Sequence, residues 1–309
     1  NIHAVRHPPK ESPKSKKGMG SYPNNPLYNF DFKELGIHNS TFNIPLTEFM
    51  YSHDNGGGTV SHRYGDKTFY FGIPWVYTYD NLLRMMRQDH ETVVSGIILV
   101  QNAGISADPV IGNLLQHPDY DEGANYSMPN LTTPESLEAF AAGLDFAANR
   151  YCTADAANGR VHYWIILNEV DMGYAWANMG DDRAMEVYMD AYYKTMRLCH
   201  NILKQYDPNA CVLASFTHSW TATEGDRAYV VTDMIERLQE YCRAEGDFDW
   251  GLAYHCYPEN LLEPRVWLDA TTTFSVNTER VSFKNLEVLD KWSSLPKNKY
   301  LGTHRRPII

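Results

Sequence analysis

The sequence lacks the features that would place it in a membrane, on nucleic acid or in a disulfide-stabilised fold. No apolar run approaches the roughly 20 residues that a membrane-spanning helix needs. The net charge is -11, and basic residues gather only between Lys10 and Lys17, so neither nucleic acid nor an anionic membrane is an expected partner. The five cysteines are widely spread without a Cys-x-x-Cys pair, which argues against a disulfide framework or a zinc motif.

A glycine loop that could cradle phosphate is also missing. Gly56-Gly57-Gly58 is the only glycine cluster, and neither a helical pattern nor Lys-Ser/Thr follows it. A nucleotide-binding sheet needs such a loop directly between a strand and a helix. We therefore expect no nucleotide-binding site.

What is present suits one large domain. The chain has 309 residues, 43% of them hydrophobic, and a single α/β barrel commonly needs this much sequence. Residues 1–20 have the composition of a linker, or form the end of a preceding domain, and residues 21–309 carry the expected barrel. The chain begins at Asn1 and stops at Ile309 within a strand-like pattern, so we expect a fragment of a longer protein.

Strand-like and helix-like patterns alternate along the chain. The expected strands are residues 37–44, 93–100, 161–169, 211–216, 249–254 and 306–309, and the expected helices are residues 26–36, 79–90, 133–144, 181–203, 229–242 and 283–292. This alternation predicts parallel βαβ units. Two long excursions, residues 50–77 and 103–132, follow strands, as insertions on the active-site face of a barrel do. The first excursion contains a predicted hairpin that turns at Gly65-Asp66.

Three of the expected strands end in polar or aromatic residues. The apolar run from Val161 ends in Asn168-Glu169, the next strand is followed by Thr217-His218-Ser219-Trp220, and the one after it by His255-Cys256-Tyr257. The carboxyl ends of barrel strands carry the chemistry of these folds, so the three endings should meet on one face. The simpler interpretation of Asn168 and Glu169 is that they cap the following turn.

When the expected strand at residues 37–44 is counted as the second strand of a barrel, Asn-Glu follows strand four, His or Trp follows strand five, and His-x-Tyr follows strand six. Together these endings resemble the clan A glycoside hydrolases. These are (β/α)8 enzymes that retain anomeric configuration. Within that clan the chain is similar to an uncharacterised glycosidase-like family of carbohydrate-degrading bacteria. The resemblance covers roughly residues 30–309. It implies a (β/α)8 TIM barrel that is incomplete at its C-terminus, a carbohydrate substrate, no cofactor, and a secreted or periplasmic location rather than a cytoplasmic one.

By position, the resemblance makes Glu169 the catalytic acid/base and Asn168 a hydrogen-bond partner of the sugar 2-hydroxyl. His255 and Tyr257 would line the subsite, and His218 would bind substrate there. Trp220 would offer a stacking face, although packing explains it equally well. The family's nucleophile is a Glu at the end of strand seven, which is expected just beyond Ile309.

Two other carboxylates, Glu48 and Glu259, lie near strand ends but do not match the nucleophile's position. Retaining hydrolysis needs two carboxyl groups about 5–5.5 Å apart, one to protonate the leaving oxygen and one to attack the anomeric carbon. Burial or a neighbouring negative charge keeps the first of them protonated near neutral pH. Glu169, at the end of an apolar strand, is expected to have such an environment.

Two further functions stay open on the sequence. A barrel that binds carbohydrate without turnover would keep the same strand ends. A metal-dependent barrel hydrolase would use His218 and His255, but it normally also needs an early His-x-His pair, and this sequence contains none. We therefore expect no metal site.

Overall fold

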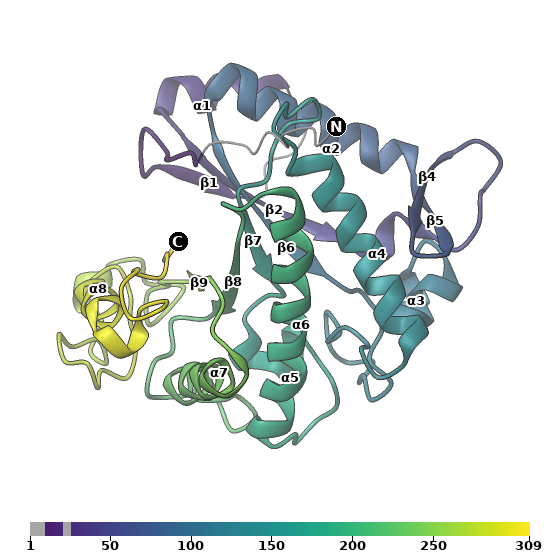
Figure 1. Cartoon of the computed structure of the whole chain (residues 1–309). Coiled ribbons are helices and arrows are strands. Elements are labelled where there is room, and N and C mark those ends of the chain that lie inside the picture. Colours follow the sequence, from purple (N-terminus) through teal and green to yellow (C-terminus); the bar gives the residue numbers. More distant parts are fainter. Residues whose placement is uncertain (1–9, 21–25) are drawn as a thin grey trace. The chain divides into compact units, whose positions relative to one another are not determined.

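Strands and helices alternate along the computed structural model, which describes residues 10–20 and 26–309 (Figure 1). The strand order of the larger sheet is β1-β2-β6-β7-β8-β9, with bounds Gly18–Gly20, Asn39–Pro45, Val93–Leu99, Tyr163–Ile166, Cys211–Phe216 and Trp250–Tyr254. The helices are α1 (Pro26–Leu35), α2 (Ile73–His90), α3 (Pro109–Leu115), α4 (Pro134–Tyr151), α5 (Gly173–Trp176), α6 (Met185–Tyr206), α7 (Val231–Glu245) and α8 (Glu287–Ser294).

Each strand of the larger sheet is followed by at least one helix before the next strand begins. Pairing is parallel between β1 and β2, between β2 and β6, and between β8 and β9. Repeated parallel strand–helix units are the architecture of the (β/α)8 barrel. The predicted fold class is therefore confirmed, with six of the eight strands present among the described residues. None of the helices described is long and apolar enough to cross a membrane.

The chain divides into two compact units, which are described separately. The first holds the described residues up to His117 together with Pro129–Ile165 and Leu198–Cys211. Its strands β2 and β6 pair from Asn39 opposite Val93 to Pro45 opposite Leu99. Most of β6 is buried, as expected of a parallel strand covered on both faces.

The predicted hairpin lies in this first unit. Strands β4 (Thr59–Tyr64) and β5 (Lys67–Gly72) pair antiparallel around the turn at Gly65-Asp66, and β3 (Met50–Tyr51) pairs with the other edge of β5. Two contacts attach the hairpin to α4. The rings of Phe71 and Phe146 stack at 3.7 Å, and His62 Nε2 lies 2.7 Å from Asp145 Oδ2.

A buried ionic cluster lies just before β7 in the same unit. Arg160 donates to Asp207 Oδ2 at 2.7 Å and to Glu11 Oε1 at 2.8 Å, and the side chains of Arg160 and Asp207 are almost fully buried. His162 accepts from the Val94 amide at Nδ1 and lies 3.1 Å from Glu11 through Nε2. Its hydrogen bond to His162 holds the pKa of Glu11 well below its usual range, against the opposing effect of burial. The amino-terminal side of a barrel serves stability rather than catalysis.

The second unit holds Pro118–Met128, Ile166–Arg197 and Val212–Ile309. Its strands β8 and β9 pair from Val212 opposite Trp250 to Phe216 opposite Tyr254, and every residue of both strands is buried. The segment 306–309 extends this ladder, because Leu252 bonds to the Pro307 carbonyl and the Tyr254 amide to the Ile309 carbonyl. The polar residues that follow β8 and β9 are thereby held by a rigid, buried core.

Several local predictions need correction. Strand β1 falls at the end of the segment 1–20, where Gly18–Gly20 pair with β2. The assignment of residues 1–20 as a linker and the domain boundary at residue 21 stay predictions. Residues 1–9 and 21–25 lie outside the described chain. Helix α6 begins at Met185, later than expected, and α3 was not predicted. Thr133 does cap α4, since its hydroxyl accepts from the Ser136 amide at 3.2 Å. No cysteine is in a disulfide among the residues described.

Candidate active site

The backbone after β7 adopts an unusual conformation around the Asn168-Glu169 pair. Leu167 and Glu169 have φ angles of 62° and 39°, in the left-handed region that non-glycine residues rarely occupy. Such conformations cost of the order of 1–3 kcal/mol each and cluster at functional sites. A hydrogen bond from the Glu169 amide to Ser215 Oγ, 3.0 Å long, anchors the turn to β8.

The side chain of Glu169 is enclosed and held by two partners. It is only 9% exposed, and its Oε1 lies 2.6 Å from Nδ1 of His255. The Tyr257 hydroxyl lies 3.2 Å from the same nitrogen. Burial, the negative charge of Glu169 and a hydrogen bond to it raise the pKa of Tyr257 to about 12, so the phenol keeps its proton and acts as a donor. The structure thus brings together three residues that the sequence predicted.

A second carboxyl, Asp171, lies two residues after Glu169 and is fully buried. Its Oδ1 accepts from the Thr217 amide at 3.0 Å, and its Oδ2 accepts from the Thr217 hydroxyl. Burial raises the pKa of Asp171 to about 6; the hydrogen bonds from Thr217 oppose this rise, and the charge of Glu169 adds to it. Asp171 therefore ties the end of β7 to the end of β8 and adds negative charge beside Glu169.

His218 belongs to a polar cluster that also contains Glu224 and Arg280. Its Nε2 lies 2.9 Å from Glu224 Oε1, and Arg280 Nε donates to the same oxygen at 2.9 Å. Burial alone would raise the pKa of Glu224, but the hydrogen bond and charge of Arg280 together with His218 lower it. The ring of His218 meets that of Tyr257 edge-on at 6.0 Å, so this cluster adjoins the one around Glu169.

The other predicted site residues have different environments. Asn168 is partly exposed and lies between the two left-handed residues. Trp220 is 2% exposed, donates its indole N–H to the Val276 carbonyl and packs edge-on against Tyr254. The expectation that Trp220 offers a stacking face to a sugar is therefore wrong, because its ring is part of the core. Glu259 accepts from the amides of Ala270 and Thr271 and so stabilises its loop.

Sequence patterns gave no indication of Glu224 or Arg280. Glu224 lies in a loop without regular structure, and Arg280 follows it by 56 residues. Neither residue directly follows a strand, so only the folded loops bring them beside His218. For metals, the described residues contain no group of three or more His, Cys, Asp or Glu side chains that could hold an ion.

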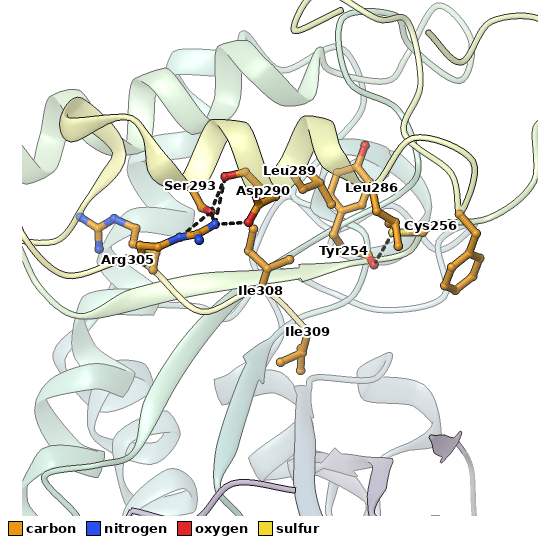
Figure 2. A pocket seen from close by; sticks show the side chains of 11 residues that line it. Tyr254, Cys256, Leu286, Leu289, Asp290, Ser293, Arg305, Ile308 and Ile309 are labelled. Carbon is orange, nitrogen blue, oxygen red and sulfur yellow. Dashed lines mark hydrogen bonds and ion pairs between the residues drawn. The ribbon is translucent and has the colours of Figure 1, made fainter. Parts of the chain in front are cut away.

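A pocket of about 500 Å³ lies between α8 and the segment that follows it (Figure 2). Tyr254 and Cys256 line it, whereas His255 and Tyr257 do not, as expected when successive side chains of an extended chain point to opposite sides. Its one carboxylate, Asp290, pairs with Arg305. The pocket therefore has no free carboxyl group for cleavage of a glycosidic bond.

Comparison with protein families identifies the chain's relatives. The model of a family of unknown function, DUF5722, matches residues 9–309. The chain belongs to the DUF5722 family. No curated protein matches this DUF5722 chain.

Several solved structures are similar to the chain. One is a glucosidase from Croceicoccus marinus (11% identity, 77% of this chain and 43% of that one, TM-score 0.44). Others are a β-1,4-D-mannanase from Cryptopygus antarcticus (12%, 76% and 60%, 0.43) and an endo-β-1,4-mannanase from Thermotoga petrophila (11%, 79% and 52%, 0.46). The chain spans about half the length of these proteins.

Proposed function

We propose that the protein is a retaining glycoside hydrolase that acts on a poly- or oligosaccharide, with Glu169 as acid/base. The observation that carries the proposal is the environment of Glu169. It is a nearly buried carboxyl at a strained strand end, in contact with an imidazole and close to a phenol that keeps its proton. A carboxyl held in one orientation and shielded from water suits proton transfer to a leaving group.

In the proposed reaction, protonated Glu169 gives its proton to the glycosidic oxygen as the leaving group departs. An attacking carboxylate forms a bond to the anomeric carbon at the same time. The Glu169 carboxylate then takes a proton from water, whose oxygen displaces the enzyme carboxylate. His255 and Tyr257 keep the Glu169 carboxyl in place through both steps, and Asn168 hydrogen-bonds the 2-hydroxyl.

The attacking carboxylate is the part of this reaction without an assigned residue. Asp171 is fully buried and bonded to Thr217, so it does not reach a sugar. Glu224 is held by His218 and Arg280, and Glu259 stabilises its own loop. Treatment of the protein with an activated 2-deoxy-2-fluoroglycoside, followed by peptide mass spectrometry, identifies the attacking residue, because the fluorine slows release of the covalent intermediate.

Turnover of a panel of polysaccharides and aryl glycosides tests the proposed function. Product configuration, followed by proton NMR during the first minutes, should match that of the substrate. Inversion would contradict double displacement. Binding of a glycan without turnover would instead favour a carbohydrate-binding barrel, which keeps the same strand ends.

A further inference from the structure

His218 has a buried nitrogen that no described residue satisfies. Its side chain is only 8% exposed. While Nε2 is paired with Glu224, Nδ1 has no hydrogen-bond partner. Buried polar atoms without partners are rare because each costs about as much as a lost hydrogen bond. The edge-on contact with the Tyr257 ring places this imidazole beside the Glu169 cluster.

Glu224 and Arg280 each keep one polar group that makes no hydrogen bond within the described chain. The oxygen Oε1 of Glu224 is approached by His218, Arg280 and Ser219, which leaves Oε2 as a vacant acceptor. Arg280 uses Nε for Glu224 and Nη1 for Thr271, which leaves Nη2 as a vacant donor. Both side chains are partly exposed, at 31% and 18%.

We propose that His218, Glu224 and Arg280 form a subsite for the hydroxyl groups of a neutral sugar ring. A sugar hydroxyl both donates and accepts hydrogen bonds. Two neighbouring hydroxyls can therefore donate to Glu224 Oε2 and accept from Arg280 Nη2, while His218 holds the Glu224 carboxylate in place through Nε2. The inference rests on the proposed function in that the ligand is a glycan.

The charges of the subsite favour a neutral sugar over an acidic one. An unpaired arginine would select the carboxylate of a uronic acid, since guanidinium and carboxylate form strong bidentate pairs. Here the guanidinium is already paired with Glu224, whose lowered pKa keeps it ionised. An acidic sugar would place its own charge against that carboxylate.

Calorimetric titration of Glu169→Gln protein with neutral hexasaccharides of mannose, glucose and xylose tests the subsite without hydrolysis. Adding Glu224→Gln should weaken binding about 10- to 100-fold, as expected for the loss of a hydrogen bond to a charged group. The matched control is Glu263→Gln, which removes an exposed carboxylate paired with Arg265 in the same unit and should leave affinity unchanged. Melting temperatures of all variants show whether each is folded. Arg280→Lys, which keeps the charge but loses the second donor, serves if Glu224→Gln does not fold.

Monodeoxy sugars distinguish direct contact between Glu224 and the sugar from a purely structural role of Glu224. A series of aryl glycosides of the bound sugar, each lacking one hydroxyl, is titrated into the Glu169→Gln protein. One analogue should bind more weakly than the complete sugar, because it lacks the hydroxyl that contacts Glu224. Adding Glu224→Gln should not weaken the binding of that analogue any further. Equal losses for every analogue, unchanged affinity in Glu224→Gln, or covalent trapping on Glu224 would each overturn the subsite. Glycan binding that depends on Glu224 without turnover by the unmodified protein would support the subsite and refute the proposed hydrolysis. Absence of any glycan binding would refute both.

Discussion

Replacement of Asp171 by Asn should stabilise the protein at pH 8 and have a much smaller effect at pH 4.5. Burial raises the pKa of Asp171 from 3.8 to about 6, so the folded protein binds this proton more tightly than the unfolded chain. The ionised carboxyl therefore contributes least to stability above pH 6. The pKa difference of about two units corresponds to roughly 3 kcal/mol at pH 8 and roughly 1 kcal/mol at pH 4.5.

Asparagine can keep both contacts with Thr217. Its side-chain oxygen accepts from the Thr217 amide, as Oδ1 does now, and its amide group can donate to the Thr217 hydroxyl. The substitution thus removes the buried charge while its hydrogen bonds remain. The pKa difference therefore sets an upper limit of roughly 3 kcal/mol on the expected gain in unfolding free energy.

Urea unfolding at the two pH values measures this gain. The control is Asp190→Asn, which removes an exposed carboxylate paired with Lys194 within one helix and should change stability by less than about 1 kcal/mol at either pH. A gain for Asp171→Asn that is the same at pH 4.5 and pH 8 would refute the electrostatic reasoning. So would a loss of stability at pH 8.

Two substitutions, one in each unit, test the packing of the protein. Asp207→Ala removes the fully buried partner of Arg160 and should lower the unfolding free energy by about 3–5 kcal/mol in urea; a loss below about 1 kcal/mol would contradict a buried, coupled pair. Gly251→Ala places a Cβ against the Pro307 carbonyl oxygen and should cost about 1–3 kcal/mol through overpacking. Gly20→Ala is the control, because a Cβ added at Gly20 would meet only open space. Equal melting temperatures for Gly251→Ala and Gly20→Ala would argue against pairing of residues 306–309 with β9.

The elements that the sequence predicted best are those with a strong local pattern. Strand β8 has the predicted bounds, and the hairpin turn at Gly65-Asp66 is present, because buried apolar runs and tight turns are determined by neighbouring residues. Strand β1 was missed because Gly18–Gly20 have no apolar pattern and depend on pairing with β2. The short helix α3 was missed within a long excursion, although Asp108 caps it.

The residues of the candidate site likewise fall into those that a local sequence pattern predicted and those that it did not. Glu169, His255 and Tyr257 follow apolar strands directly, so strand ends predicted that they would meet. Trp220 also follows a strand, but the sequence could not show that its ring turns into the core. Glu224 and Arg280 join the cluster only through the folding of two irregular loops. Their positions depend on tertiary contacts that no local pattern records.

The most direct test of the acid/base assignment is the leaving-group dependence of Glu169→Gln. Cleavage of a glycoside with a poor leaving group needs protonation, so its kcat/KM should fall by about 10²–10⁴-fold. A dinitrophenyl glycoside departs with little protonation, so its cleavage should fall far less. Glu263→Gln should leave both rates unchanged. An equal loss on both substrates in Glu169→Gln would contradict the assignment of Glu169 as the catalytic acid.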